Sequence, residues 1–495
     1  MSLSSTGRSR PNIVYIMVDD MGQGDVSCFN PTSAWTTPCI DRMAREGRRF
    51  TDAHSASAIC TPSRYALLTG RYAWRTRLKR GVLRGYSEAL IEPGRLTVPG
   101  LLKRHGYATA MLGKWHLGLD WVRTGPEPDE VDFSQPVGGG PTAHGFDRFY
   151  GISASLDMPP YVYFDDDRAE SVPTRTIGDS PKPKMWRAGY IADDFQHEKV
   201  LPEMARRSVA YIKERAADPA RRPFFLYIAP ASPHTPIVPT PEFLGRSRTT
   251  VYGDFVLQTD DLVGQVMNAI DEAGLGGNTL IVFTADHGVA PAANLPELRT
   301  FHHDSSAGFR GHKADIYEGG HRVPFVVRWP AAVPAGTMCA APIAQADLLA
   351  TCAEMLGDSL DDAAGEDSVS ILDLLTGADQ PRAPRPPIVH HSENGSFAIR
   401  DGRWKLCLCP GSGGWSYPHP ERDAHLILPP FQLFDLQADP GEKNNLAESQ
   451  SDLVQRLGRL MVEYIAAGRS TPGKPQRNTS EEEWPQLAWR EAFAG

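Results

Sequence analysis

Cys60 stands where a nucleophile could act on a bound anion. It opens the run Cys60-Thr61-Pro62-Ser63-Arg64, and an apolar, helix-compatible run follows over residues 65–69. Thr, Pro and Ser in this order are typical of a helix start. A helix N-terminus offers unpaired N–H groups and the positive end of the helix dipole, so an anion beside Cys60 would be stabilised. Arg64 would add a fixed cation. An isolated cysteine, however, is more often a buried structural residue.

Acidic side chains follow two short apolar runs of the sequence. Asp19 and Asp20 come after the first of these runs, and Asp286 and His287 come after the other. Carboxylate oxygens suit a hard divalent cation such as calcium, whereas the imidazole of His287 is also favoured by manganese or zinc. By itself, an Asp pair after a strand is more often a turn or a helix cap. Three converging carboxylates would repel one another strongly without a cation, which favours a metal site.

Four basic side chains could serve a doubly charged group that is transferred at this site. They are Lys114, His116, His234 and Lys313. Lys114 and His116 are two residues apart, so both would point the same way on an extended segment. A lone histidine in a Pro-rich loop, such as His234, is ordinarily structural. The interpretation as donors therefore depends on all four residues meeting at one place.

Four other polar side chains remain open in role. His302, His303 and Arg310 precede Lys313 in a Gly- and His-rich loop, and they either line the mouth of a site or face solvent. Ser155 lies in a small-residue segment where a flexible-loop serine is the simpler interpretation.

Alternating strand and helix patterns would position these residues. Residues 12–18, 224–229 and 279–284 are short apolar runs rich in β-branched or aromatic side chains, as in buried parallel strands. Residues 202–217 and 252–273 carry apolar side chains at helical spacing. This order predicts an α/β fold with a large, mostly parallel, mixed sheet flanked by helices on both faces. The polar clusters fall beyond the carboxyl ends of the strands, where such sheets bind ligands.

The rest of the chain divides into an excursion and a second unit. Residues 120–187 are rich in Gly, Pro and Asp and predict a long, substrate-shaping excursion over the sheet edge. A Pro-rich linker over residues 380–387 marks a boundary. Alternating runs and one amphipathic helix beyond it predict a smaller antiparallel sheet with a helix. We therefore predict a catalytic domain at residues 1–378, a C-terminal subdomain at 388–470 and a tail at 471–495.

The composition is that of an ordinary globular protein. The 495 residues are 41% hydrophobic and 22% charged, with a net charge of -9 that is spread along the chain. We expect neither nucleic acid nor a membrane as partner, because there is no basic block and no apolar run long enough to span a bilayer. Seven thinly spread cysteines are unlike a disulfide scaffold, and no secretory signal is visible. These features predict a cytoplasmic location.

The surroundings of Cys60 resemble the signature of a known enzyme family. The pattern Cys60-x-Pro62-Ser63-Arg64, followed by Leu67-x-Thr69-Gly70-Arg71, is similar to the highly specific signature of the type I sulfatases, arylsulfatase-like members of the alkaline phosphatase superfamily. In that family the cysteine is oxidised to Cα-formylglycine. Further segments resemble sulfatase motifs in the family's order: Asp19-Asp20, Gly113-Lys114-Trp115-His116-Leu117-Gly118, Pro233-His234-x-Pro236, Asp286-His287-Gly288, Lys313, Tyr317-Glu318-Gly319-Gly320-x-Arg322-Val323-Pro324 and Phe434-Asp435-Leu436-x-x-Asp439-Pro440-Gly441-Glu442.

The resemblance implies a role for each matched residue. It implies one divalent metal ion, Ca²⁺ or alternatively Mn²⁺, in a site where the family usually has Asn or His at the position of His287. The implied metal ligands are Asp19, Asp20, modified Cys60, Asp286 and His287. The implied catalytic residues are Cys60, Arg64, Lys114, His116, His234 and Lys313, and those that bind substrate are Lys114, His234 and Lys313.

The implied reaction is hydrolysis of a sulfate monoester. One hydroxyl of the hydrated formylglycine attacks sulfur in line, with Asp286 taking its proton, while His234 and Lys313 protonate the leaving oxygen. The second hydroxyl then expels sulfate, with His116 as its base. The implied partners are a small-molecule or carbohydrate sulfate ester and a formylglycine-generating maturation enzyme; the sequence does not indicate an oligomeric state.

Two alternatives remain open at this point. The wider superfamily uses the same formylglycine and metal for phosphoryl transfer, so a phosphonate monoester or phosphodiester hydrolase is the nearest rival. A non-catalytic metal- or glycan-binding relative would be favoured if a ligand or Cys60 were missing, but each matched position holds a competent residue.

Overall fold

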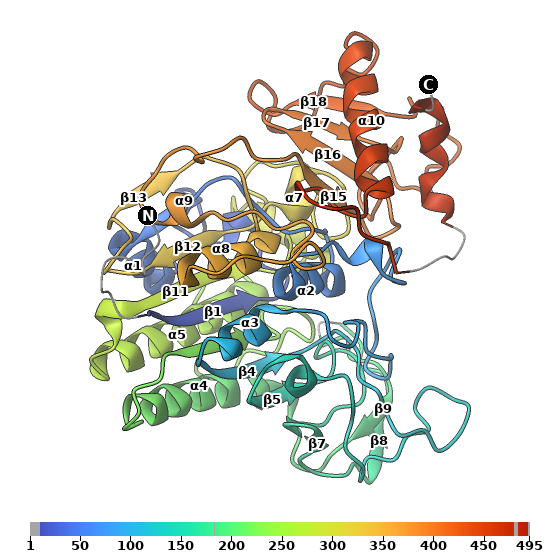
Figure 1. The fold of residues 1–495 in the computed structure, drawn as a ribbon. Coiled ribbons are helices and arrows are strands. Elements are labelled where there is room, and N and C mark those ends of the chain that lie inside the picture. The colour runs from blue at the N-terminus through green and yellow to red at the C-terminus, as the bar shows by residue number, and fades with distance from the viewer. Residues whose placement is uncertain (1–9, 183, 480–483, 494–495) are drawn as a thin grey trace.

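A ten-stranded mixed β-sheet runs through the larger part of the molecule (Figure 1). The structure is a computed structural model that describes residues 10–182, 184–479 and 484–493. In spatial order the strands are β13 (Thr337–Cys339), β2 (Arg48–Phe50), β12 (Phe325–Arg328), β11 (Thr279–Ala285), β1 (Asn12–Val18), β10 (Phe224–Ala229), β4 (Ala108–Lys114), β5 (Arg148–Ile152), β6 (Phe164–Asp165) and β7 (Arg168–Ala169).

The five central strands of this sheet are parallel. β11, β1, β10, β4 and β5 run in one direction, whereas β12 and β6 pair antiparallel at either side of them. β1 is buried along nearly its whole length because it has a neighbour on each edge and helices on each face, which explains its continuous apolar sequence. The register pairs Val18 with Ala285, so Asp19 and Asp286 leave the sheet at the same level.

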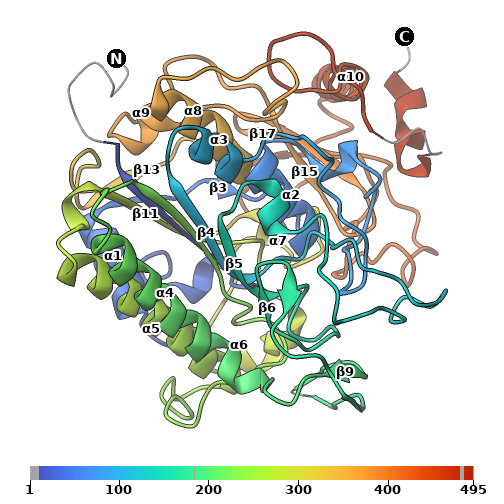
Figure 2. The ribbon, with the colours of Figure 1, turned by 60° about the horizontal axis from the view of Figure 1, so that its bottom comes forward.

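Helices cover both faces of the sheet. Figure 2 shows one layer of α1 (Pro38–Glu46), α4 (Val200–Ala216) and α5 (Val251–Glu272) on one side, and α2 (Cys60–Thr69), α3 (Val98–Arg104) and α8 (Leu348–Leu356) on the other. The N-cap of α5 is Thr250, whose side chain accepts a hydrogen bond from the Gly253 N–H. α2 is buried along its whole length, so it lies inside the molecule and has no solvent-facing side.

Shorter elements connect these layers. They are α6 (Leu295–Thr300), α7 (Glu318–His321), α9 (Leu372–Leu375), the pair β3 (Ala53–His54) with β14 (Ile343–Ala344), and the pair β8 (Arg175–Ile177) with β9 (Gly189–Ile191).

A smaller unit is built from the C-terminal part of the chain. Its four-stranded antiparallel sheet contains β15 (Ile388–His391), β16 (Phe397–Asp401), β17 (Trp404–Cys407) and β18 (Gln432–Asp435), and α10 (Ser451–Ala466) packs against it (Figure 1). The 3₁₀ segment Pro485–Phe493 packs on α10. Trp74 joins this unit's apolar core, so the two parts share a packed junction. The division into domains at residues 378 and 388 stays a prediction.

The predicted fold class is confirmed. The predicted strands at 12–18 and 224–229 have the bounds observed, and the third predicted strand runs one residue further, to Ala285. The helices predicted at 202–217 and 252–273 begin and end within two residues of α4 and α5. The excursion at 120–187 was expected to lie outside the sheet. Instead, it contributes β5, which pairs with β4 from Ala110 to Lys114.

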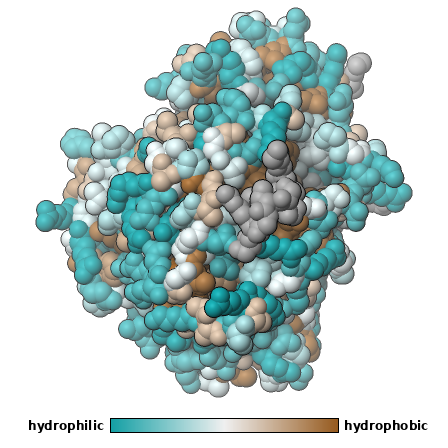
Figure 3. All heavy atoms as spheres, turned by 60° about the vertical axis from the view of Figure 1, so that its left-hand side comes forward, coloured by the Kyte–Doolittle hydropathy of each residue, from teal (hydrophilic) through white to brown (hydrophobic). Residues whose placement is uncertain are grey.

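The surface carries no broad apolar area on the face seen in Figure 3. Teal, hydrophilic atoms dominate that face, and the brown areas are small and separate. Among the described residues, none of the helices has the length and apolar character that crossing a bilayer requires. None of the seven cysteines forms a disulfide. The cytoplasmic location stays a prediction.

Candidate active site

All ten residues predicted for the site lie together beside the N-terminus of α2. They come from loops at the carboxyl ends of β1, β4, β10 and β11, from α2 itself and from the loop before α7. Each of them is at most 6% exposed. The ten are Asp19, Asp20, Cys60, Arg64, Lys114, His116, His234, Asp286, His287 and Lys313. Their individual roles stay predictions, whereas their convergence is a property of the fold.

Cys60 is the first residue of α2, one position earlier in the helix than its sequence suggested. Its Sγ lies 3.2 Å from His287 Nε2 and 3.7 Å from Asp19 Oδ1. The helix closes at Gly70, whose φ of 63° is left-handed and suits glycine. An oxygen in place of Sγ would therefore lie among the carboxylates and at the positive end of the helix dipole.

Four of the five predicted metal ligands could share one ion. Ligand atoms of Asp19, Asp20, Cys60 and His287 all lie within 4.8 Å of one another. The fifth, Asp286, places Oδ1 3.4 Å from His287 Nε2. Three buried carboxylates around one point form an oxygen-rich donor set, which fits a hard divalent cation. Asp20 adopts a left-handed φ of 64°, an uncommon conformation that directs its carboxylate into this group.

Two buried lysines balance the carboxylates. Lys114 Nζ lies 2.6 Å from Asp19 Oδ2, and Lys313 Nζ lies 2.6 Å from Asp20 Oδ1. Burial alone would raise the pKa of the Cys60 thiol, but Lys114 and Lys313 outweigh it and lower that pKa well below its usual value. The pKa of Asp19 is likewise lowered against the effect of burial, mainly by Lys114 and His234. The site therefore stabilises negative charge at the position of Cys60.

Arg64 holds Asp286 in place from the first turns of α2. Its Nη2 and Nε donate to Asp286 Oδ2 at 2.9 and 3.2 Å. Burial and the Asp19 carboxylate nevertheless raise the pKa of Asp286. Its second oxygen, Oδ1, accepts a hydrogen bond from the Asp20 N–H at 3.3 Å. A carboxylate with a raised pKa is suited to accept a proton near neutral pH.

The hydrogen bonds of His116 fix which of its ring nitrogens can act as a base. His116 Nε2 donates to the Leu83 carbonyl at 2.8 Å, which leaves Nδ1 as the nitrogen with a lone pair. Nδ1 is buried without a partner among the described residues, and Cys60 is its neighbour. Burial and Lys114 lower the pKa of His116, so its ring is neutral. His116 does not continue β4 as an extended segment; its φ of 59° turns the chain back.

His234 is anchored by its other nitrogen. Its Nδ1 donates to the Thr235 carbonyl at 2.5 Å, and its Nε2 lies 3.5 Å from Asp20 Oδ2. Nε2 is therefore on the side of the ring that faces Asp20, and it could deliver a proton to a group bound there.

A cavity of about 390 Å³ opens above Cys60. Ser155 lines it and is 1% exposed, with its Oγ lacking a partner in the described structure. The flexible-loop interpretation of Ser155 is therefore wrong. Sequence reasoning missed Asp157, Arg187 and Trp415, which also line this cavity. Their segments have no periodicity or motif, and Trp415 comes from the C-terminal unit, so only the folded chain brings them here.

The loop before Lys313 forms a separate cavity. His302 and Arg310 line a space of about 600 Å³ that does not include Cys60. His302 is exposed and Arg310 is half-buried, so a place at the mouth of a site stays a prediction. His303 Nε2 lies 2.9 Å from Asp25 Oδ1, and its ring stacks on Trp35, so it is a structural residue.

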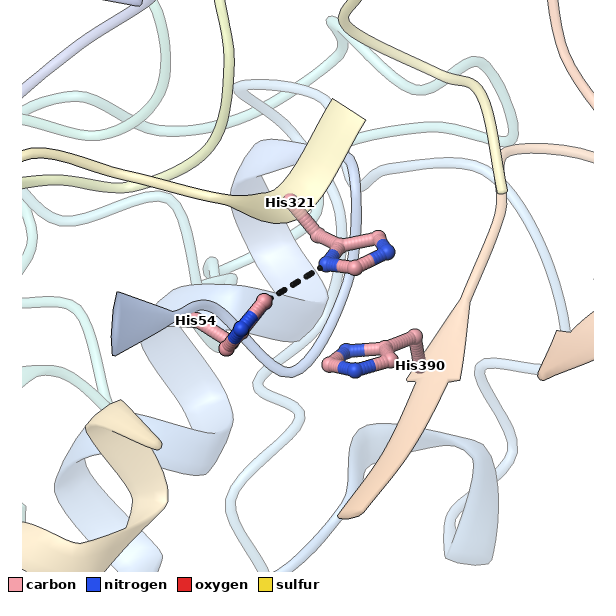
Figure 4. Close-up of side chains that lie close together, drawn as sticks. All are labelled: His54, His321 and His390. Atoms are coloured by element: carbon pink, nitrogen blue, oxygen red, sulfur yellow. Dashed lines mark hydrogen bonds between the residues drawn. The ribbon is translucent and has the colours of Figure 1, made fainter. Parts of the chain in front are cut away.

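A second group of buried histidines lies at the junction of the two units. Figure 4 shows His54 directed at His321, with Nδ1 atoms 3.0 Å apart, and His390 lying flat against His321. The His321 and His390 rings are 3.7 Å apart with a 9° angle between their planes. A metal ion must lie in the plane of each imidazole that binds it, and two parallel planes share no such point. The stacked pair is therefore a packing feature of the junction.

The chain is also similar to known proteins of one enzyme family. The family model described as Sulfatase matches residues 11–358. The chain is 33% identical to an N-acetylgalactosamine-6-O-sulfatase of Bacteroides thetaiotaomicron, which covers 91% of this chain and 92% of that protein. It is also 33% identical to human arylsulfatase A, with 91% and 87% covered.

A solved structure shows the same similarity in three dimensions. It comes from work on the metabolism of multiple glycosaminoglycans by Bacteroides thetaiotaomicron, and it aligns with a TM-score of 0.80 at 31% identity over 92% of this chain and 99% of that one. The signature at Cys60, the convergence of the ten residues and these matches together assign the chain to the sulfatase family.

Proposed function

We propose that this sulfatase hydrolyses the sulfate monoester of a carbohydrate, with an aldehyde hydrate formed from Cys60 as nucleophile. The observation that carries the proposal is the position of Cys60: at a helix N-terminus, 3.2 Å from His287 and beside two buried lysines. The sulfatase relatives support sulfate as the group transferred, and one of them is named for a sulfated amino sugar.

The metal and the modified residue each supply one part of the chemistry. A divalent ion, for which we propose calcium because three carboxylates converge, would act as a Lewis acid that neutralises the sulfate oxygens. The hydrated aldehyde would supply two hydroxyls on one carbon, so one can attack sulfur and the other can later release sulfate. The side chains of the protein bind the sulfate and transfer the protons.

Each residue's contacts suit a distinct step. Lys114 and Lys313 bind the sulfate oxygens, because both ammonium groups are fixed beside Cys60. Asp286, held by Arg64, takes the proton of the attacking hydroxyl. His234 gives a proton to the leaving oxygen from Nε2, since its Nδ1 is held by Thr235.

His116 completes the cycle. Its Nδ1 lone pair, fixed by the bond from Nε2 to Leu83, removes the proton from the second hydroxyl, so the carbonyl reforms and sulfate leaves. A plain serine at position 60 would lack that hydroxyl and would retain the sulfate as an ester.

A substrate comparison tests the proposal. Protein with converted Cys60 is assayed on a sugar sulfate, an aryl sulfate, an aryl phosphonate monoester and a phosphodiester, and kcat/KM is compared. We expect the sulfate esters to be preferred. Preference for the phosphorus substrates would overturn the proposal in favour of the phosphonate or phosphodiester hydrolase.

A further inference from the structure

One carboxylate in the active-site cavity has an oxygen with no partner. Asp157 follows β5 and is 6% exposed. Arg187 Nη1 pairs with its Oδ2, whereas its Oδ1 is buried and makes no hydrogen bond within the described residues. His234 also faces Oδ1, but its Nδ1 is 4.0 Å away and already donates to Thr235. Neither the metal cluster nor the lysine pairs involve Asp157.

An ionised carboxylate only accepts hydrogen bonds. A buried acceptor without a donor is costly, so a buried oxygen at a cavity wall points to a ligand that supplies the donor. The ligand group cannot be the sulfate itself, because two anionic groups would repel each other. It must be a neutral donor, such as a hydroxyl or an amide N–H, on the part of the substrate that leaves.

The position of Asp157 agrees with this assignment. It lies beside His234, which faces the leaving oxygen, whereas the sulfate is bound on the side of Lys114 and Lys313. Ser155, two residues earlier, lines the same wall with an unpartnered Oγ. The wall is therefore polar at the place where the atoms next to the ester oxygen must lie.

The acceptor is held rigidly before any ligand binds. The Arg187 N–H and the Tyr161 hydroxyl both donate to the Asp157 carbonyl, at 3.1 and 3.0 Å. The Arg187 side chain then fixes Oδ2, and this side chain is 49% exposed, so it retains donors for a second contact. A fixed acceptor next to a fixed donor matches neighbouring sugar hydroxyls, each of which can donate and accept.

An aromatic side chain offers the complementary apolar contact. Trp415 reaches the cavity from the C-terminal unit and is 40% exposed. A ring of this kind packs on the C–H face of a sugar while the hydroxyls at its edge face polar groups.

We propose that Asp157 and Arg187 form a subsite that binds a hydroxyl or amide of the sugar next to the sulfate ester, and that this subsite selects carbohydrate sulfates over aryl sulfates. The proposal rests on the sulfate-ester hydrolysis proposed above. It assigns the selection of the leaving group to residues that take no part in the sulfuryl transfer.

The test compares two substrates and two variants. With converted enzyme, kcat/KM is measured on the best sugar from a panel of monosulfated hexoses and hexosamines and on 4-methylumbelliferyl sulfate. Asp157→Ala should lower kcat/KM for the sugar sulfate about 10- to 100-fold, as expected for a lost hydrogen bond to a charged group, and change it less than about 3-fold for the aryl ester. The matched control is Asp193→Ala, which removes an exposed acid that pairs with Arg175 and does not line the cavity.

A second arm changes the substrate. Deoxy analogues of the sugar sulfate, each lacking one hydroxyl, are assayed with the unaltered enzyme. For one of them, kcat/KM should be lower by the same factor by which Asp157→Ala lowers it for the intact sugar sulfate. For that analogue, Asp157→Asn and Asp157→Ala should not lower kcat/KM any further. Equal losses on sugar and aryl sulfates, or no deoxy analogue with a loss, would overturn the subsite. Turnover of the aryl sulfate reports the proposed function separately, so the two failures are distinguishable.

Discussion

Buried charge is the main feature of the site at the scale of single residues. Asp19 and Asp20 are each paired with a lysine at 2.6 Å, and Arg64 is paired with Asp286 at 2.9 Å. Desolvating so many charges is costly unless each has a partner. Ligand atoms of Asp19, Asp20, Cys60 and His287 also lie within 4.8 Å of one another, and such an oxygen-rich set is suited to hold a cation.

Calcium should therefore stabilise the folded protein directly. When free calcium is 100 times its Kd, binding to the folded state adds about 2.7 kcal/mol to the free energy of unfolding. We expect the thermal midpoint of the metal-free protein to rise with added calcium, independently of any activity. In Asp20→Asn, which loses one ligand charge, the rise should be much smaller. Exposed Asp129→Asn serves as the control. An equal rise in Asp20→Asn would contradict the assignment of this ligand.

At the scale of elements, α2 and the segment after it connect the active site to the C-terminal unit. Arg75 follows α2 and donates to both oxygens of Asp367 at 2.9 and 2.8 Å, and to the Tyr464 carbonyl of α10 at 2.9 Å. The Arg75 and Asp367 side chains are fully buried. This bidentate pair fixes the far end of the helix that carries Cys60.

Removal of Arg75 should cost far more than removal of a surface arginine. Arg75→Ala leaves the buried charge of Asp367 without its cationic partner, so we expect the free energy of unfolding to fall by about 3–5 kcal/mol. The comparison is Arg148→Ala, because Arg148 pairs with Glu214 at the surface and should change stability by less than about 1 kcal/mol. Urea unfolding of both variants measures the difference. Similar losses in both would show that burial does not set the strength of these pairs.

The elements also show what a sequence can predict. β1 and β10 had the predicted bounds because strands buried on both faces are continuous apolar runs with abrupt polar ends. β5 was missed because Arg148–Ile152 contains a glycine and an exposed arginine, and its pairing with β4 depends on contacts distant in sequence. Local pattern thus predicts the centre of the sheet better than its periphery.

The same limit applies to the site. The ten motif residues could be named because most of them stand near a strand end or a helix start, whereas His234 and Lys313, in loops, were named from their resemblance to family motifs. Asp157 and Trp415 could not be named, since their segments carry no period and only tertiary packing brings them to the cavity. The left-handed turn at His116 was also not predictable, because non-glycine residues rarely adopt it.

At the scale of the whole molecule, the histidine group in Figure 4 makes the junction of the two units sensitive to acid. Lys405 Nζ lies 3.0 Å from His321 Nε2, and the Nδ1 atoms of His321 and His54 lie 3.0 Å apart. Burial holds the pKa of each of these rings below its usual value, with His390 and Lys405 adding to the effect at His321.

The acidic groups that face these histidines are already paired. Asp52 is bound by Arg400 and Arg322, and Glu318 is bound by Lys405 and Arg322. Asp52 Oδ1 also lies 2.7 Å from His54 Nε2, but burial outweighs Asp52 and Glu318 and keeps the pKa of His54 low. The folded state keeps these rings neutral.

Stability should consequently fall as the pH is lowered. The unfolded chain binds protons at a histidine pKa near 6.5, whereas the folded chain resists them, so stability is full above that pH and declines below it by about 1.4 kcal/mol per pH unit for each such histidine. The thermal midpoint measured from pH 7.5 to 5 reports this. His390→Phe keeps a stacked ring but cannot titrate, so its midpoint should fall less steeply. An identical slope would exclude His390 from the effect.

The dependence of activity on the chemical state of Cys60 tests the central claim most directly. Protein is prepared with different degrees of conversion by varying co-expression of the maturation enzyme, and mass spectrometry of the peptide around Cys60 gives the fraction that carries an aldehyde. The rate of hydrolysis of a sulfate ester per mole of protein should rise in proportion to that fraction and vanish at zero conversion, as it should for Cys60→Ala. A rate that is independent of the fraction converted would contradict the account.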